Sequence, residues 1–331
     1  MTSAVLFDRP GAPHVLRFVP VDRITPGPDE VLIQVQAAGV NNADLLERRG
    51  LYPVPPGAPR GLGLECAGTI SAIGRDVTDW KIGDEVCALL TGGGYAEEVA
   101  VPAVQVMPKP RGVTMAEAAS FPEVACTVYS NLAMIAGLTA GETVLIHGAG
   151  GGIGSFAIQW ARAIGAHVIT TAGSTAKTDA ARELGVLEAI NYRTEDFVSR
   201  TLAATDGRGV DAILDVVGAK YLQRNLKCLA PDGHLIMIGG SMNPTTIDLW
   251  ELLARRASIS ATMLRGRPTA QKQAIVAGVT REVLPLIETG LIRPTIDSIF
   301  PLSQANRAHE LLETGRTIGK VVLERDTHRP R

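Results

Sequence analysis

The hydrophobic pattern from residue 143 onward alternates between short apolar runs and longer segments with helical spacing. The segment 155–165 carries apolar residues at helical intervals and therefore predicts a helix. The apolar runs predict strands at 143–147, 167–171, 188–191, 210–214, 234–238 and 257–262. Strands that alternate with helices build a parallel sheet with helices on both of its faces. This part of the chain therefore predicts an α/β fold with a doubly wound parallel sheet.

The first 122 residues have a different pattern, in which short strand signals are interrupted by glycine and proline. Examples are the runs at 31–40, 65–74 and 84–90. This pattern predicts a compact, mostly antiparallel β domain with little helix. The stretch from Gly50 to Gly63 contains four prolines and four glycines, which predicts a long ordered loop of the kind that often carries function.

The last part of the chain mixes both patterns. We expect a helix near 270–289, a second helix near 303–314 and a strand at 319–324. Because strand signals resume after the helices, we expect the last strand to return to the sheet of the first domain. The chain then has two domains, one formed by residues 1–122 together with 265–331 and the other by residues 123–264.

The composition indicates a large hydrophobic core. The 331 residues are 46% hydrophobic and 20% charged, which argues against a disordered protein. The formal charge of −2, without a long basic run, argues against a nucleic-acid partner. The chain has neither a transmembrane-length apolar stretch nor a start typical of a signal peptide, so we expect no membrane partner and a cytoplasmic location. Four scattered cysteines are typical of free thiols in a reducing compartment: Cys66, Cys87, Cys126 and Cys228.

The first predicted strand of the parallel sheet leads into a glycine-rich turn and then a helix. The G-x-G-x-x-G pattern falls on Ala149, Gly151 and Gly154, with alanine in the first place. Alanine is tolerable there if the residue does not need a positive φ. Unpaired N–H groups at the helix start bind a pyrophosphate, so we assign Gly152 and Ile153 to a dinucleotide site together with Ala149 and Gly151. A glycine-rich turn without a ligand is the alternative.

The second strand of the sheet indicates which dinucleotide is bound. An NAD site has Asp or Glu near the end of this strand, whereas here the strand ends in Ala172, Gly173 and Ser174. Lys177 follows three residues later, and Tyr192 comes after the next strand. A hydroxyl and an ammonium accept a 2′-phosphate that a carboxylate would repel, so the sequence predicts NADPH. The alternative is a solvated lysine and a surface tyrosine.

The later strand ends are expected to complete the cofactor site. Ligands bind beyond the carboxyl ends of parallel strands, although turn glycines are also common there without any ligand. The residues assigned to the cofactor on this ground are Val217, Gly239, Gly240, Ser241, Met263 and Leu264.

Several motifs together resemble a known family. They are Asn41–Leu45, Gly61–Gly68, Lys81–Asp84, Leu89–Glu97, the glycine turn, Thr171–Ser174 and Ile318–Leu323. The chain resembles the zinc-free quinone oxidoreductase branch of the medium-chain dehydrogenase/reductase superfamily over nearly its whole length. Within that branch it is most similar to the p53-inducible quinone oxidoreductase-like proteins, by the stretches 121–123 and 191–193.

The resemblance implies a GroES-like first domain and a Rossmann second domain, with the active site in the cleft between them. It also implies NADPH as the cofactor, a small-molecule acceptor, and a homodimer joined through the edges of the Rossmann sheets. The strands at 234–238 and 257–262 are the candidates for that contact.

The resemblance also bears on metal binding. In related alcohol dehydrogenases the catalytic zinc ligands lie at positions that correspond to Asn41, Leu64 and Glu123. Leucine cannot bind zinc and asparagine is a poor ligand, so we expect no metal. For the neighbouring Glu65 we expect a salt bridge or a buried hydrogen bond.

The resemblance assigns catalytic roles to three residues. Asn42 and Tyr52 face the acceptor oxygen, and Thr127 lies at the nicotinamide. Alternatives are a helix cap for Asn42, loop packing for Tyr52 and a place in a helix interior for Thr127. For His147, at the end of the fingerprint strand, we expect a packing role.

We therefore expect NADPH-dependent reduction of a quinone or an activated enone. One alternative is an enoyl-thioester or 2-alkenal reductase, in which Arg48, Arg49 and Arg60 could receive a pantetheine arm. A non-catalytic NADPH-binding sensor is the other alternative.

Overall fold

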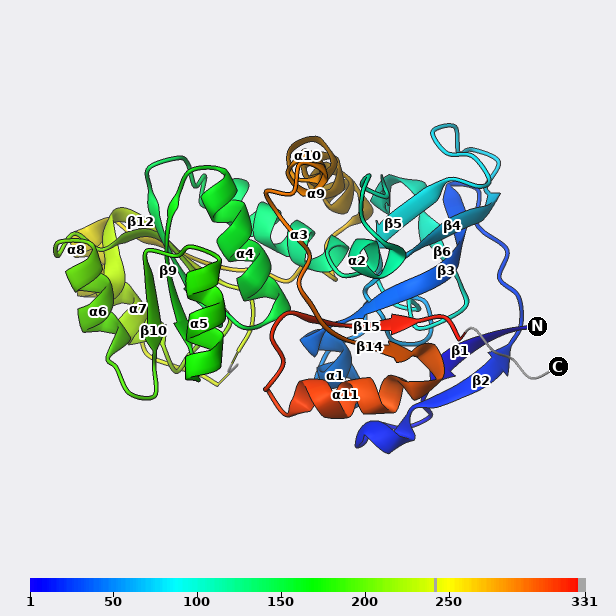
Figure 1. Cartoon of the computed structure of the whole chain (residues 1–331), viewed down its shortest axis with the longest axis horizontal. Coiled ribbons are helices and arrows are strands. Elements are labelled where there is room, and N and C mark those ends of the chain that lie inside the picture. Colours follow the sequence, from blue (N-terminus) through cyan, green and yellow to red (C-terminus); the bar gives the residue numbers. More distant parts are fainter. Residues whose placement is uncertain (241–242, 327–331) are drawn as a thin grey trace. The chain divides into compact units, whose positions relative to one another are not determined.

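A computed structural model describes residues 1–240 and 243–326 of the chain. The chain forms two compact units (Figure 1). The first unit contains Met1–Cys126, Leu264–Gly290 and the chain from Pro294 onward. The second unit contains Thr127–Met263 and Leu291–Arg293.

The second unit is built on a six-stranded, wholly parallel sheet. The strand that leads into the glycine turn lies inside the sheet, and the strand order is that of a Rossmann fold. The prediction of a doubly wound parallel sheet is therefore confirmed. In spatial order the strands are β10 (Glu188–Asn191), β9 (His167–Ala172), β8 (Thr143–His147), β11 (Val210–Asp215), β12 (Leu229–Met237) and β13 (Ser258–Ala261).

Helices cover this sheet, as Figure 1 shows. The helix expected at 155–165 already begins at Gly152, because Gly151 caps it and the last glycines of the turn are helical. This helix packs against β8 and β9. The helices are α4 (Gly152–Ala163), α5 (Thr175–Glu183), α6 (Phe197–Ala204), α7 (Leu222–Cys228) and α8 (Leu249–Arg255). The fully buried Leu145, Ile213 and Leu235 belong to the core beneath them.

The first unit contains a seven-stranded sheet in which every pairing except that of β14 with β15 is antiparallel. This confirms the mostly antiparallel β domain. The path through the sheet is β14 (Ile296–Pro301), β15 (Lys320–Glu324), β3 (Glu30–Val40), β4 (Glu65–Ile73), β5 (Glu85–Leu89) and β7 (Val106–Pro108), with β6 (Glu98–Pro102) on β3. The strands β1 (Thr2–Leu6) and β2 (Arg17–Val21) form a separate antiparallel pair.

The end of the chain joins this sheet. β15 pairs antiparallel with β3, so that Val321 lies opposite Val40. The single helix expected near 270–289 is wrong: α9 (Thr269–Glu282) and α10 (Leu284–Glu288) are separated at Val283. The break coincides with Pro285, which has no backbone N–H to donate. Further α-helices are α1 (Asn42–Arg48), α2 (Met115–Ala119), α3 (Pro122–Val128) and α11 (Ala305–Glu313).

Two further expectations concern the whole chain. All four cysteines are free and buried, as the scattered spacing predicted. Within residues 1–240 and 243–326, no helix is long and apolar enough to cross a membrane.

Candidate functional site

The turn after β8 has the backbone that a dinucleotide fingerprint needs. Gly148 takes the positive φ of +85°, whereas Ala149 does not, so the methyl group of Ala149 is accommodated without strain. The N–H groups of Gly148 and Ala149 both donate to the carbonyl of Thr171 at 3.0 Å. Gly151 has extended backbone angles and caps α4. The predicted sequence of strand, turn and helix is therefore present.

The glycines of this turn have different surroundings. A Cβ on Gly154 would lie 2.2 Å from the carbonyl oxygen of Gly148, so the helix and the turn can approach only with glycine there. A Cβ on Gly151 would meet nothing nearer than 3.7 Å. By helix geometry the N–H groups of Gly152 and Ile153 have no intrahelical acceptor. The turn therefore presents N–H donors on a side where the backbone is open, which is what a pyrophosphate requires.

The residues expected at the second phosphate gather near the carboxyl end of β9. A Cβ on Gly150 would lie 2.5 Å from Cδ of Lys177, so the lysine stem lies against the glycine turn. A Cβ on Gly173 would lie 2.4 Å from the Tyr192 hydroxyl, so this hydroxyl lies against the tip of β9. Ser174 is exposed, and its side chain makes no capping bond to α5. A hydroxyl, a phenol and an ammonium thus border one end of the strand.

The nearest carboxylate on α5 is turned to another partner. Asp179 pairs with Arg182 at 2.6 Å on the exposed side of the helix. It therefore does not take the place of the ribose-binding acid of an NAD site.

The turns after β11 and β12 pack on each other. Asp215 accepts hydrogen bonds from the N–H groups of Val217 at 2.6 Å and Gly218 at 3.1 Å. Gly240 has φ of +100°, and a Cβ there would lie 2.1 Å from the carbonyl oxygen of Val217. Gly239 is exposed beside it. Ser241, also expected at the cofactor, lies outside the described residues.

A buried polar chain connects three strand ends beneath the glycine turn. His147 accepts from the Thr171 hydroxyl at Nδ1 (2.9 Å) and donates from Nε2 to Asn225 Oδ1 (2.8 Å). Asn225 Nδ2 in turn donates to Asp215 at 3.0 Å, so its Oδ1 is the acceptor and the Nε2–H tautomer of His147 follows. Burial lowers the pKa of His147 to about 4, which keeps the ring neutral. Sequence analysis missed the roles of Asn225 and Asp215, because no local pattern connects them to His147.

Thr127, Met263 and Leu264 lie where the chain passes from one unit to the other. Thr127 is buried in α3, and its carbonyl accepts from Asn131 Nδ2 at 2.7 Å. Asn131 Oδ1 accepts from the Thr262 hydroxyl at 2.7 Å, which fixes the segment that ends at Met263. Met263 is exposed and belongs to the second unit, whereas Leu264 is buried in the first.

In the first unit a buried lysine joins two of the motif residues. Lys320 donates to Asn41 Oδ1 at 2.6 Å and forms an ion pair with Glu65. Asn41 Nδ2 donates to Glu65 Oε1 at 2.8 Å, and the N–H of Glu123 donates to Oε2 at 2.9 Å. Glu65 is fully buried. The expected salt bridge of Glu65 is therefore confirmed, and its partner, Lys320, comes from the far end of the chain.

The donor set at positions 41, 64 and 123 does not fit zinc. Leu64 has no donor atom and is buried, and the amide oxygen of Asn41 accepts from the ammonium of Lys320. Zinc takes thiolate, imidazole or carboxylate ligands. In the described ranges no group of three or more His, Cys, Asp or Glu side chains could hold a metal ion.

Asn42 and Tyr52 both belong to the first unit. Asn41, not Asn42, is the N-cap of α1, and the Asp44 carboxylate accepts from the Asn41 N–H at 2.8 Å. The capping alternative for Asn42 is therefore wrong, and its side chain is exposed at the first helical position. Tyr52 is half-buried in the long loop, with the Arg265 guanidinium carbon 5.7 Å from its ring centre. Burial and the nearby Glu123 raise the pKa of Tyr52 to about 12, so the phenol is a donor at neutral pH.

The arginines considered for a pantetheine arm are mostly engaged elsewhere. Arg48 is buried, donates to the carbonyl of Gly11 at 3.1 Å and forms an ion pair with Glu313. Arg49 pairs with the same carboxylate at 2.8 Å. Arg60 is exposed, and its Nη2 lies 3.8 Å from the exposed carboxylate of Asp8.

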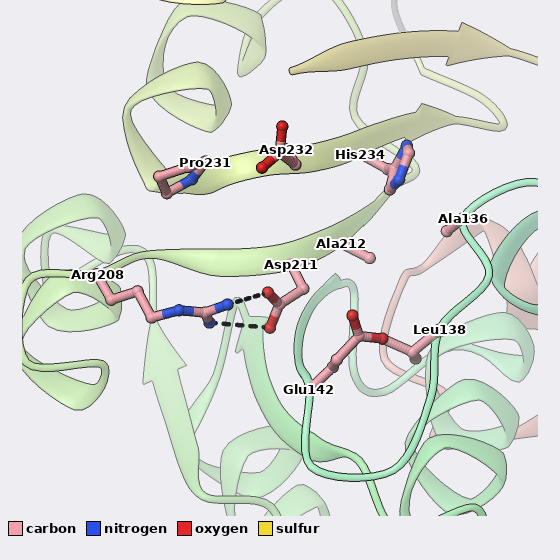
Figure 2. A pocket seen from close by; sticks show the side chains of 9 residues that line it. All are labelled: Ala136, Leu138, Glu142, Arg208, Asp211, Ala212, Pro231, Asp232 and His234. Atoms are coloured by element: carbon pink, nitrogen blue, oxygen red, sulfur yellow. Dashed lines mark hydrogen bonds and ion pairs between the residues drawn. The ribbon is translucent and has the colours of Figure 1, made fainter. Parts of the chain in front are cut away.

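One pocket of the second unit lies away from the glycine turn. Figure 2 shows Arg208 paired with Asp211 at one side of it, and Glu142 and His234 among the other lining residues. Asp211 lies at the amino end of β11, and Glu142 directly precedes β8. The pocket therefore lies at the amino-terminal ends of the strands. The residues assigned to the cofactor lie at the carboxyl-terminal ends, where a Rossmann sheet binds its ligand.

Comparison with known proteins gives consistent matches for both units. Residues 27–111 match the alcohol dehydrogenase GroES-like domain, and residues 184–323 match the zinc-binding dehydrogenase family. The quinone oxidoreductase of Pseudomonas aeruginosa is 37% identical over 329 residues, which cover 98% of this chain and 99% of that protein. The GroES-like character expected for the first domain is thereby confirmed.

The comparison with solved structures gives matches of the same kind. The Escherichia coli quinone oxidoreductase, solved as a complex with NADPH, superposes with a TM-score of 0.85 at 33% identity, covering 97% of this chain and 99% of its own. The CurK enoyl reductase superposes with a TM-score of 0.86 at 29% identity, covering 98% of this chain and 99% of its own.

Proposed function

Because the chain belongs to the medium-chain dehydrogenase/reductase superfamily, we propose that it is an NADPH-dependent quinone oxidoreductase that works without zinc. The observation that carries the cofactor choice is the end of β9, where Lys177 and Tyr192 lie against glycines of the cofactor turn and strand tip. The quinone oxidoreductases among its relatives, one of them solved with NADPH, support the same choice.

The residues of the second unit suit the parts of NADPH. The N–H groups of Gly152 and Ile153 would hold the pyrophosphate, above Ala149 and Gly151. Ser174, Lys177 and Tyr192 would hold the 2′-phosphate through charge-assisted hydrogen bonds. The turns at Val217, Gly239 and Gly240, together with Met263, would line the rest of the nucleotide. When bound, NADPH supplies a hydride.

Independence from zinc is supported by the chemistry of the first unit. Lys320 places a fixed positive charge on Asn41 and Glu65, and a cation there repels a metal ion. A quinone needs little Lewis-acid assistance, since its reduced form is aromatic. We propose that Asn42 and Tyr52 donate hydrogen bonds to the acceptor oxygen, and that Thr127 packs at the nicotinamide.

Reduction of an enoyl thioester or an alkenal is the second candidate, favoured by the similarity to an enoyl reductase. Against it, Arg48 and Arg49 are engaged by Glu313, so they do not offer the basic pocket rim that a pantetheine arm would use. A non-catalytic NADPH sensor is the third candidate.

An acceptor assay separates these candidates. NADPH oxidation is followed with saturating benzoquinone, with a 2-alkenal and with a crotonyl thioester. We expect the highest kcat/KM with the quinone. Preference for the thioester would support the second candidate, and tight NADPH binding without any acceptor-dependent oxidation would support the sensor.

We also propose a homodimer. β13 forms an edge of the parallel sheet, so one side of its backbone has no strand partner among residues 1–240 and 243–326. The adjoining α8 exposes Leu249 to 64%, Trp250 to 77% and Leu253 to 69%. A second copy of this chain, paired along β13, would cover both features. The four buried free thiols support a reducing compartment such as the cytoplasm.

A further inference from the structure

The buried hydrogen-bond chain beneath the glycine turn has a direction, and Asp215 sets it. A backbone N–H group can only donate, and Asp215 Oδ1 accepts from those of Val217 at 2.6 Å and Gly218 at 3.1 Å. The N–H of Gly218 also lies 3.2 Å from Asp215 Oδ2. Because both carboxylate oxygens are acceptors, the remaining contact of Asp215, at 3.0 Å, takes its proton from Asn225 Nδ2.

This direction is passed on to His147. With its nitrogen turned to the carboxylate, Asn225 presents Oδ1 to His147, so Nε2 of the ring carries the proton at 2.8 Å. Nδ1 has no proton and accepts from the Thr171 hydroxyl at 2.9 Å. The imidazole also makes T-shaped contacts with the Phe197 and Tyr221 rings, whose centres each lie 5.0 Å away. The chain therefore cannot reverse unless the Asn225 amide turns over.

The two ends of the chain hold two turns that we assign to the cofactor. At one end, the Thr171 carbonyl accepts from the N–H groups of Gly148 and Ala149 in the glycine turn, each at 3.0 Å. At the other end, Asp215 holds the 216–218 turn through the two backbone N–H groups described above. A continuous path of hydrogen bonds thus connects the glycine turn to the turn that follows β11.

The 216–218 turn also packs directly on its neighbours. A Cβ on Gly148 would lie 3.2 Å from Cγ2 of Val216, so the Val216 side chain lies against the glycine turn. A Cβ on Gly240 would lie 2.1 Å from the carbonyl oxygen of Val217. A shift of the 216–218 turn would therefore change its spacing from the turns on both sides.

Stability alone does not account for a polar chain at this place. Its four side chains, Thr171, His147, Asn225 and Asp215, are each at most 1% exposed. Apolar side chains of similar volume can fill such a space without loss of stability, because a buried hydrogen bond gains little over bonds to water. A fully satisfied network instead gives the core one defined geometry.

We propose that Asp215 and Asn225 are positioning residues for the cofactor, which hold the 216–218 turn at the distance from the glycine turn that a bound dinucleotide needs. The inference rests on the proposed NADPH site. Both side chains are buried, so they act through the turns. These turns are assigned to parts that NADPH and NADH share, so disturbing the chain should weaken both nucleotides equally. Loss of Lys177, in contrast, should weaken NADPH selectively.

The variant Asp215→Asn interrupts the chain where it starts. The new amide oxygen still accepts from the two backbone N–H groups, but the new amide nitrogen faces Asn225 Nδ2, so that two donors meet. Loss of this hydrogen bond should weaken NADPH and NADH alike, by about tenfold in fluorescence titrations of the folded protein.

The matched control is Asp211→Asn, which makes the same substitution on the same strand. Asp211 also accepts from a backbone N–H, that of Thr143 at 2.8 Å, but it lies at the amino end of β11. The control should lower the free energy of unfolding in urea and leave both nucleotide affinities at the wild-type value. An equal loss of affinity in Asp211→Asn would show that affinity merely follows stability, and would overturn the proposal.

Exchanging the two side chains should restore the chain. In the double variant Asp215→Asn with Asn225→Asp, the amide at 215 donates to the carboxylate at 225, which still accepts from His147 Nε2. Affinity for both nucleotides should return close to the wild-type value. An affinity that stayed as low as in Asp215→Asn would mean that the hydrogen-bond chain is not what positions the turns.

Nitrogen-15 NMR of the histidine side chains tests the direction of the chain in the wild-type protein, where no variant has to fold. At neutral pH His147 should be the Nε2–H tautomer. In Asp215→Asn the Asn225 amide is free to turn over, so the Nδ1–H tautomer should appear. An Nδ1–H tautomer in the wild-type protein would overturn the proposal.

The titrations also separate this inference from the proposed function. Wild-type affinity for both nucleotides in folded Asp215→Asn, or a loss confined to NADPH, would overturn the inference and leave the proposed function intact. Tight NADPH binding by the wild-type protein without reduction of any acceptor would refute the proposed function and leave the inference intact.

Discussion

The aliphatic part of Lys177 lies against Gly150, close enough that a methyl group on the glycine would meet Cδ at 2.5 Å. The contact brings the first turn of α5 to the glycine turn that opens α4. A nucleotide that lies on the turn therefore has its second phosphate within reach of a lysine rather than a carboxylate. We propose that this relationship gives the protein a preference for NADPH.

Removing the ammonium of Lys177 should weaken NADPH selectively. Lys177→Met keeps the stem on Gly150 and loses a charge-assisted hydrogen bond, so NADPH affinity should fall by about 1.5–3 kcal/mol. NADH lacks the 2′-phosphate and serves as the internal control. Fluorescence titration with both nucleotides measures the change in each affinity. An equal loss of affinity for NADPH and NADH would show that Lys177 does not bind the 2′-phosphate.

A side chain on Gly151 should block the cofactor while leaving the fold intact. A Cβ there meets nothing nearer than 3.7 Å, so Gly151→Val should fold, but its methyl groups would occupy the space of the pyrophosphate. Gly154→Ala is the contrasting variant. Its Cβ would lie 2.2 Å from the Gly148 carbonyl oxygen, so this variant should have a lower melting temperature than wild type. NADPH affinity retained in Gly151→Val would show that the nucleotide does not cross this turn.

The buried His147 should make stability depend on pH in acid. Its pKa is about 4 in the folded protein and about 6.5 in the unfolded chain, so the unfolded chain binds the proton first as pH falls. Its stabilising contribution is complete above pH ~6.5 and is lost as pH falls to ~4, by up to about 3 kcal/mol. Urea unfolding of wild type and His147→Gln across this range isolates the effect, since other groups cancel in the difference. Parallel pH curves for the two proteins would contradict the assignment.

Glu65 and Lys320 should be strongly coupled. Lys320→Met leaves the fully buried carboxylate of Glu65 without its cation, and breaking such a pair costs about 3–5 kcal/mol. Adding Glu65→Gln removes the uncompensated charge and should restore much of the loss. A double-mutant cycle by urea unfolding measures the coupling. Additive single effects would mean that the two groups do not act as a pair.

The exposed apolar face of α8 should control dimerisation. Trp250→Glu places a charge where a second copy would pack, so the dimer dissociation constant should rise at least about tenfold. The control is Leu187→Glu, which is 54% exposed next to β10 at the opposite edge of the sheet. Light scattering over a concentration series reports the mass, and a wild-type monomer or a Trp250→Glu dimer of unchanged strength would rule out this interface.

The parts of the site that could be predicted from the sequence are those made by neighbouring residues. The glycine turn follows its strand directly, and Ser174 and Lys177 follow the next strand, so strand, turn and first helical turn could be placed together. The break before α10 also had a local signal, Pro285, which a continuous apolar pattern concealed. Asp44, three residues after Asn41, likewise marked the true start of α1.

The pairs that the sequence did not reveal join distant parts of the chain. Lys320 and Glu65 are 255 positions apart, and Arg265 and Glu47 are 218 positions apart. No periodicity relates such residues, because they meet only when strands and loops of the first unit have folded together. The polar chain from Thr171 through His147 to Asn225 is hidden for the same reason.

The central claim is that a phosphorylated nicotinamide nucleotide binds over the turn at Gly151, with Lys177 on its second phosphate. Titration of the wild-type protein with NADPH and with NADH, in the same buffer and at the same ionic strength, tests it most directly. We predict that NADPH binds at least about tenfold more tightly, the value of one charge-assisted hydrogen bond. Equal affinities, or tighter binding of NADH, would contradict it.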